Sequence, residues 1–368
     1  MSTAFKDLYS REFIRDFGLL IAKFKSDFDV KVFQENVLHG NWKELELKER
    51  MRKITLCMHN SMNLEFPEVI PILIKVAQEG LRNRTKFNEI VCLSVPDYLA
   101  QFGMNHFELC MNTFPEITEF ATCEFAIRPF ILANPERAVQ IILTWTNNSN
   151  EHVRRLASEG TRSRLPWGMA LGVFKKDPSS ILPILDQLKN DDSEYVRRSV
   201  ANNLNDISKD NPEVTMSLAK SWIGINSNTK KLVKHALRTQ LKAGDQEALK
   251  LFGLGYDEML SLQKFELITQ NVQIGEDLTF DFEIKNLDDK DRIVRVEYVI
   301  YFLLKNGNFG KKVFKISERN YCSKEIIKSR KNHKFKIITT RKYYPGNHAV
   351  SLSINGMELQ KTSFTLKD

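Results

Sequence analysis

The stretch Asn150-Glu-His-Val-Arg-Arg-Leu-Ala-Ser-Glu-Gly-Thr-Arg-Ser-Arg-Leu-Pro-Trp-Gly168 contains the pattern around which this 368-residue chain is organised. A second stretch, Asp192-Ser-Glu-Tyr-Val-Arg-Arg-Ser-Val-Ala-Asn-Asn-Leu204, repeats its Val-Arg-Arg core after 43 residues. A weaker third copy is Leu232-Val-Lys-His-Ala-Leu-Arg-Thr-Gln-Leu241. Helix pairs that recur every ~35 to 45 residues are typical of HEAT-like solenoids. We therefore predict stacked helical repeats whose equivalent helices line one concave surface.

Helix start signals support this interpretation. Asn134-Pro135, Asp177-Pro178 and Asn211-Pro212 each precede an apolar run, as expected of a polar N-cap followed by proline at the first helical position. Residues 1 to about 110 carry apolar side chains at spacings of three and four, without strand-like alternation. We expect an all-α, HEAT-like domain over residues 1–258.

The pattern changes to a period of two after Ser261. Residues 278–284 and 294–302 alternate between apolar and polar side chains, and turn signals separate further candidate strands at 311–317, 334–340, 347–354 and 358–366. About seven short strands in this length are typical of an immunoglobulin-like sandwich, although the Cys-Trp-Cys pattern of antibody domains is missing. The chain is thus expected to be multidomain, with an all-β sandwich at 261–368.

Composition restricts the class of protein. No apolar run reaches the ~18 residues that a membrane helix needs, and the first residues lack the build of a signal peptide. The five cysteines are scattered without CxxC spacing, which favours a reducing cytosol over a zinc site or disulfide framework. We expect a cytoplasmic monomer that does not bind membranes.

The net charge of +8 is unevenly distributed. Residues 305–342 contain 13 Lys and Arg against 2 Glu, which leaves the rest of the chain slightly acidic. Such a stretch either keeps the surface soluble or binds a polyanion.

Basic residues of the repeats could line a groove for nucleic-acid phosphates. The simpler alternative is that each arginine bonds a carboxylate of the neighbouring repeat. The candidate DNA-binding side chains are Arg154, Arg155, Arg162, Arg164, Arg197, Arg198, Lys231 and Lys234 in the repeats, and Lys328, Arg330 and Lys331 in the sandwich.

Three carboxylates are candidates for chemistry. Glu124 lies at the border of an apolar stripe over residues 120–130, where an i,i+4 pair with Arg128 is the simpler interpretation. Glu159 follows Arg155 by one helical turn, and the 43-residue alignment places it opposite Asn202. Asp206 follows one turn after Asn202, so the inner turn after Arg-Arg is polar in both copies.

Trp167 stands in the Leu-Pro-Trp-Gly exit of the first repeat. A single tryptophan usually belongs to a core, and that interpretation competes with a role at the site.

The chain resembles the AlkC branch of the AlkC/AlkD-like DNA alkylation repair glycosylases. The resemblance rests on Glu124-Phe-Ala-Ile-Arg-Pro-Phe130, on Asn150–Gly168, on Val196–Pro212, and on helical repeats followed by a small sandwich. AlkD-like relatives lack the sandwich, so its presence favours AlkC.

The resemblance implies excision of N-alkylated bases, such as 3-methyladenine and 3-methylcytosine, from double-stranded DNA without a metal or organic cofactor. Glu124, Glu159 and Asp206 would form the acidic cluster that stabilises the sugar cation, with Glu124 and Asp206 favoured for the chemistry. Trp167 would face the lesion, which would not be flipped into a deep pocket, and the basic strands of the sandwich would close around the duplex.

Two other functions remain open at this point. A non-enzymatic HEAT scaffold would bind DNA, RNA or protein, and it would not need carboxylates in an arginine-lined groove. A binder of damaged DNA without chemistry would bind such DNA and release no base.

Overall fold

The computed structural model describes residues 5–85, 87, 92–337 and 342–368. It divides into two compact units, residues 1–236 and 237–368, each of which is described by itself. Within the described residues, no helix is long and apolar enough to span a bilayer.

The first unit is helical throughout. Its elements are η1 (Phe5–Leu8), α1 (Arg11–Ala22), α2 (Val30–Leu38), η2 (Trp42–Glu44), α3 (Leu47–Met62), α4 (Phe66–Arg82), α5 (Ser94–Phe102), α6 (Phe107–Ile117), α7 (Arg128–Ala133), α8 (Pro135–Trp145), α9 (Glu151–Glu159), α10 (Gly172–Lys176), η3 (Ser179–Ile181), α11 (Leu182–Leu188), α12 (Glu194–Ile207), α13 (Pro212–Trp222) and α14 (Ser227–Ala236).

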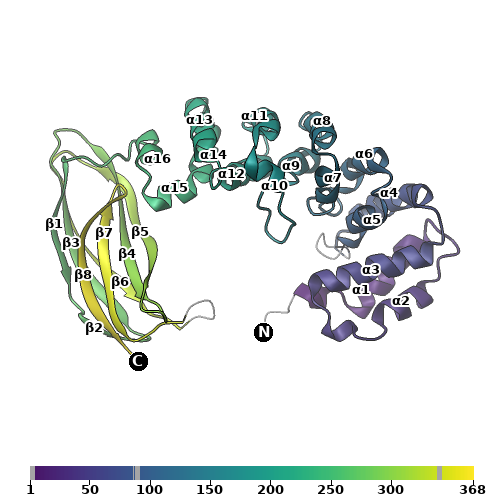
Figure 1. The fold of residues 1–368 in the computed structure, drawn as a ribbon, viewed down its shortest axis with the longest axis horizontal. Helices are drawn as coiled ribbons and strands as arrows, with labels where there is room; N and C mark the ends of the chain where they lie inside the picture. The colour runs from purple at the N-terminus through teal and green to yellow at the C-terminus, as the bar shows by residue number, and fades with distance from the viewer. Residues whose placement is uncertain (1–4, 86, 88–91, 338–341) are drawn as a thin grey trace. The chain divides into compact units, whose positions relative to one another are not determined.

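The repeat predicted from the Val-Arg-Arg stretches is confirmed. Helices α8, α11 and α13 form one layer, and α9, α12 and α14 form a second layer against it (Figure 1). The stretches Asn150–Gly168 and Asp192–Leu204 contain α9 and most of α12. The third copy, 232–241, is interrupted at Leu237 and is divided between the end of α14 and the start of the next helix, α15 (Arg238–Ala243). Val153, Val196 and Val233 hold equivalent positions and are buried, which anchors each inner helix to its repeat.

Two local expectations were wrong. Residues 120–127 form turns instead of a helix that carries an apolar stripe, and α7 begins only at Arg128. Asp177-Pro178 leads into the short η3, and α11 begins after it with Pro183 at its first turn. By contrast, Asn134 caps α8 by accepting a hydrogen bond from the Arg137 backbone.

The second unit carries the predicted β-sandwich. Its elements are α15 (Arg238–Ala243), α16 (Gln246–Leu251), β1 (Leu260–Leu267), β2 (Asn271–Gln273), β3 (Asp277–Asn286), β4 (Arg292–Leu303), β5 (Phe309–Tyr321), β6 (Ile326–Lys334), β7 (Gly346–Ile354) and β8 (Met357–Lys367).

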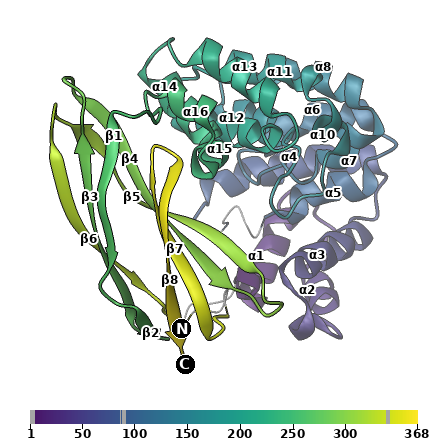
Figure 2. The same ribbon diagram turned by 60° about the vertical axis from the view of Figure 1, so that its left-hand side comes forward.

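The strands form two layers (Figure 2), with the order β1-β3-β6 in one sheet and β2-β8-β7-β4-β5 in the other. β2 runs parallel to β8, while the other pairs are antiparallel. Inward side chains such as Phe280, Val296 and Leu352 are buried between the sheets. The Asn355-Gly356 turn joins β7 to β8 with both residues at positive φ, as the sequence signal predicts.

The strand expected at 334–340 was wrong in position. β6 ends at Lys334, residues 335–337 belong to no strand, and residues 338–340 lie outside the described residues. The strands at 260–267, 271–273 and 326–334 were not predicted. The α15–α16 segment groups with the strands through Gly244, whose backbone packs against Gly356. The expected boundaries, 1–258 and 261–368, stay a prediction.

Candidate functional site

Helix α9 supplies the centre of the candidate site. It begins after Asn150, whose side-chain oxygen accepts a hydrogen bond from the His152 backbone, and it ends at Glu159. Its apolar face is buried. Arg155 and Glu159 lie one turn apart on the neighbouring face. The turn before α7 brings Glu124 to this face, and the following helix α12 brings Asp206.

Together with Arg162, these four side chains form a row of alternating charge in the order Glu124, Arg155, Glu159, Arg162 and Asp206. One guanidinium nitrogen of Arg155 pairs with Oε2 of Glu124, and another lies 3.6 Å from Oε1 of Glu159. Arg162 joins the next two carboxylates, with Nη1 2.6 Å from Glu159 Oε1 and Nε 2.8 Å from Asp206 Oδ2. The structure thus brings the three candidate carboxylates together. Their catalytic roles stay predictions.

Neutral side chains and a lysine complete the hydrogen bonds of the row. The Thr122 hydroxyl donates to Glu124 Oε2 at 2.9 Å, and the Ser199 hydroxyl donates to Glu159 Oε2 at 2.6 Å. Lys209 Nζ lies 3.2 Å from Asp206 Oδ1. Because burying an unpaired charge is costly, this full set of partners explains how five ionisable groups fold into the repeat interface.

The carboxylates keep the two arginines charged. Burial lowers the pKa of Arg155, but the charges of Glu124 and Glu159 outweigh burial and hold that pKa above its ordinary value. Burial likewise lowers the pKa of Arg162, and Glu159 and Asp206 raise it further than burial lowers it.

The side chain of Arg128 fixes the loop that follows α9. This side chain is fully buried, and its guanidinium group donates to the backbone carbonyls of Met169 at 2.5 Å, Gly160 at 3.1 Å and Arg162 at 2.8 Å. Burial and the nearby Arg162 charge lower the pKa of Arg128 to about 10. Arg128 therefore does not form the ion pair with Glu124 that was the simpler interpretation of Glu124. It holds the loop that carries Trp167.

Trp167 is not a core residue. It is 70% exposed, and its φ of +64° lies in the left-handed region. The backbone N–H of Gly168 donates to the Leu165 carbonyl, which closes a turn with Pro166 and Trp167 at its centre. Proline followed by a left-handed residue is the pattern of a type II turn, in which glycine or asparagine usually takes the position that Trp167 holds.

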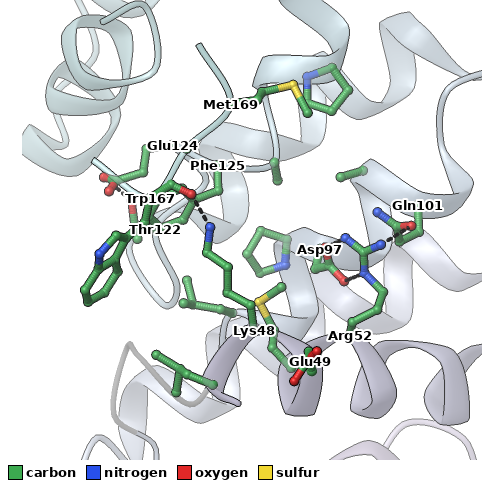
Figure 3. Close-up of a pocket in the computed structure, with 18 of the residues that line it drawn as sticks. Lys48, Glu49, Arg52, Asp97, Gln101, Thr122, Glu124, Phe125, Trp167 and Met169 are labelled. Carbon is green, nitrogen blue, oxygen red and sulfur yellow. Dashed lines mark hydrogen bonds and ion pairs between the residues drawn. The ribbon is translucent and has the colours of Figure 1, made fainter. Parts of the chain in front are cut away.

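A cavity of about 920 Å³ opens between this loop and helices α3 and α5 (Figure 3). Glu124, Glu159, Arg162 and Trp167 are among its lining residues, and most of the others are apolar. Asp206, which is only 2% exposed, is not a lining residue. Among the described residues, no group of three or more His, Cys, Asp and Glu side chains is placed to hold a metal ion.

Within each Arg-Arg pair, the two arginines have different roles. Arg154 donates to the carbonyls of Asn148 and Ser149, and Arg197 donates to those of Asp191 and Asp192. The first arginine of each pair therefore fixes the turn before its own helix. Arg154 also forms a two-bond ion pair with Asp191 of the next repeat, at 2.6 and 2.9 Å. Arg154 thus follows the simpler alternative, in which an arginine of the repeats bonds a carboxylate of the neighbouring repeat.

The other predicted cations of the repeats are more accessible. Arg198 occupies the position equivalent to Arg155 in the 43-residue alignment. It is exposed and forms an i,i+4 ion pair with Glu194 at 2.9 Å. Arg164 pairs with Asp210 at 2.6 Å from a more exposed position. Lys231 is exposed and Lys234 is half-buried, both on α14. Their predicted contact with DNA stays a prediction.

The predicted cations of the sandwich lie on β6. Lys328 and Arg330 are exposed and pair across to β3, with Glu283 at 3.2 Å and Asp281 at 2.7 Å. Lys331 is half-buried because strand alternation places it on the opposite face, which it shares with buried His333. The three side chains therefore do not share one face.

Residue-level reasoning missed Arg128 as a loop anchor, together with Thr122, Ser199 and Lys48. Arg128 belongs to the motif Glu124–Phe130, and its position directly before Pro129 indicates a helix start. No sequence signal showed that its partners would be carbonyls more than 30 residues away.

Comparisons with known proteins agree with this architecture. Residues 261–368 match the family model described as "Uncharacterised protein YhaZ, C-terminal Ig-like domain". The chain is 41% identical over 353 residues to the uncharacterised protein YhaZ of Bacillus subtilis (strain 168), covering 95% of this chain and 96% of YhaZ. It is 32% identical to the Pseudomonas fluorescens alkylpurine DNA glycosylase AlkC, solved bound to DNA containing an abasic site analogue, with a TM-score of 0.92 and full coverage of both chains. The chain belongs to the AlkC-type family of DNA alkylation repair glycosylases.

Proposed function

We propose that this protein is a DNA glycosylase that removes cationic N-alkylated bases, such as 3-methyladenine and 3-methylcytosine, from double-stranded DNA. The observation that carries the proposal is the full-length likeness to AlkC, whose structure holds DNA with an analogue of an abasic site. An abasic site is what remains after a glycosylase has released its base. Three members of the row, Glu124, Glu159 and Arg162, line the cavity and support the same proposal.

The chemistry needs little from the protein, because a cationic base has an already weakened glycosidic bond. As the base departs, positive charge develops on the sugar, and a carboxylate fixed nearby stabilises that charge. Glu124 and Glu159 both line the cavity, so we assign them the contact with the sugar or the attacking water. Asp206 is buried behind Arg162 and supports the row from the α12 side.

Trp167 is the aromatic group proposed to face the lesion. Its exposed indole ring lies on the side of the Glu124 carboxylate in Figure 3, and both residues line the same cavity. The face of an indole ring attracts a cation, which would favour a positively charged lesion over an ordinary base.

Phosphate contacts are proposed for the accessible cations of the inner helices, such as Arg198 and Lys231. Arg155 and Arg162 are instead proposed to act inside the row, because their guanidinium groups are already bonded to carboxylates.

The test is base release from methylated DNA, measured by chromatography with boiled protein as the control. We expect release of 3-methyladenine or 3-methylcytosine above the spontaneous rate. Absence of both would refute the glycosylase and leave the scaffold and the damaged-DNA binder.

Carboxylate variants then separate catalysis from binding. Glu124→Gln should lower the single-turnover rate by about 10²-fold or more while DNA affinity is kept, as for other electrostatic groups that act on a developing charge. Equal release by Glu124→Gln and the unaltered protein would remove Glu124 from the chemistry.

A further inference from the structure

Lys48 makes a contact that links the N-terminal helices to the candidate site. It stands in the first turn of α3, and its side chain crosses to the loop after α9, where Nζ donates to the Trp167 carbonyl (Figure 3). The same Nζ atom lies 5.4 Å from the centre of the Phe125 ring. Phe125 directly follows Glu124, so one side chain contacts both the acidic turn and the tryptophan loop.

The Trp167 peptide needs such a contact. A residue other than glycine in the left-handed region is strained, and it persists only where surrounding bonds hold it. Arg128 holds the loop through carbonyls on either side, at Arg162 and Met169. The hydrogen bond from Lys48 falls on Trp167 itself, at the strained position.

We infer that Lys48 is a positioning residue that fixes the Trp167 indole relative to the Glu124 carboxylate. The inference rests on the proposed function for its effect on base excision, and it rests on geometry alone for its effect on the loop. Lys48 acts through the backbone of Trp167 and the ring of Phe125, and it has no assigned contact with the reacting atoms.

The competing role for Lys48 is a contact with DNA phosphate, since its side chain is exposed. The two roles predict different measurements. A phosphate contact contributes about 0.9 to the slope of log affinity against log salt concentration, whereas a positioning contact contributes nothing to that slope.

Tryptophan fluorescence gives a readout that does not depend on activity. The chain has four tryptophans, of which Trp42, Trp145 and Trp222 are at most 7% exposed, while Trp167 is 70% exposed. Time-resolved anisotropy of the DNA-free protein, with Trp167→Phe as the blank, therefore reports the motion of this one ring.

The variants are Lys48→Met, which keeps the length and removes the charge, and Lys48→Arg, which keeps a donor. Lys53→Met on the same helix is the control for the anisotropy, because Lys53 donates to the His39 carbonyl; Lys53 also lines the cavity, so it does not serve as a control for excision. For Lys48→Met we expect a new fast component in the Trp167 anisotropy and a threefold to tenfold slower excision, the range of one lost hydrogen bond. DNA affinity and its salt slope should stay unchanged, and Lys48→Arg should recover most of the rate.

Unchanged anisotropy in Lys48→Met would overturn the inference, and a salt slope lowered by about 0.9 would assign Lys48 to a phosphate instead. If the unaltered protein releases no base, the proposed function fails, yet the anisotropy comparison still decides whether Lys48 holds the loop.

Discussion

Replacing Arg162 by methionine tests whether this arginine serves the fold or contacts DNA directly. The side chain is 7% exposed and joins Glu159 and Asp206, which are 6% and 2% exposed. Removing one partner of a buried ion pair costs about 3–5 kcal/mol, because the remaining charge stays buried without compensation. Glu159 keeps the Ser199 hydroxyl and Asp206 keeps Lys209, so we expect a loss near the lower end, about 3 kcal/mol.

Urea unfolding followed by tryptophan fluorescence measures this loss, since all four tryptophans lie in the first unit. Arg198→Met is the control, because Arg198 is an arginine of the following repeat whose ion pair, with Glu194, is exposed to solvent. An exposed i,i+4 pair contributes about 0.5 kcal/mol or less.

In DNA binding, the control variant Arg198→Met should show the larger effect and Arg162→Met the smaller one. Arg198→Met should lower the salt slope of DNA affinity by about 0.9, the contribution of one phosphate contact, and folded Arg162→Met should leave the slope unchanged. The reasoning is refuted if Arg162→Met keeps its stability within 1 kcal/mol and loses salt-dependent affinity, because Arg162 would then be a phosphate ligand.

Two further predictions concern other parts of the chain. Burial lowers the pKa of His348 below 6.5, so the unfolded chain takes up the proton first as the pH falls. Calorimetry should show full stability of the second unit above pH 6.5 and a loss of up to about 1.4 kcal/mol per pH unit below it, with a flatter profile for His348→Gln. A matching slope in that variant would contradict this account, in which neutral His348 accepts the Leu303 N–H. In α4, Gly80→Ala should destabilise the first unit by about 1–3 kcal/mol in urea, because its Cβ would lie 2.3 Å from the Phe120 ring. Gly172→Ala has open space and should be neutral, and equal unfolding midpoints for the two variants would argue against the clash.

The repeat was predictable because its signal is local and recurs. Val153 and Val196 mark the same buried position in two helices, and few folds besides a stack of helical repeats produce a helix pattern that recurs after 43 residues. The strands with strict alternation were predictable for the same reason. The edge strand β6 was misplaced because its outward positions are basic and its inward positions include Ser329 and Lys331, so the contrast between its two faces is weak.

The roles within the site were not predictable, because they depend on tertiary partners. Arg155 and Arg198 occupy equivalent sequence positions, yet the Arg155 side chain is 15% exposed between two carboxylates and the Arg198 side chain is 66% exposed. The difference arises from Glu124, which the turn before α7 brings to Arg155 from outside the repeat. Arg128 shows the same limit, since its partners are backbone carbonyls that carry no sequence signature.

The charge count of the row explains why its arginines and carboxylates occur together. The three carboxylates and two guanidinium groups of the row sum to one negative charge. Lys209 offsets this charge from a side chain that is 39% exposed, and the buried Arg128 guanidinium interacts with all three carboxylates. Without the arginines, three buried like charges would destabilise the repeat interface. Glu124 and Glu159 line the cavity and Arg128 does not, so fixed carboxylate oxygens can face the proposed cationic base and the sugar cation left by its departure. Neutralising Glu124 or Glu159 should therefore remove more of the electrostatic assistance than neutralising Asp206, which does not line the cavity.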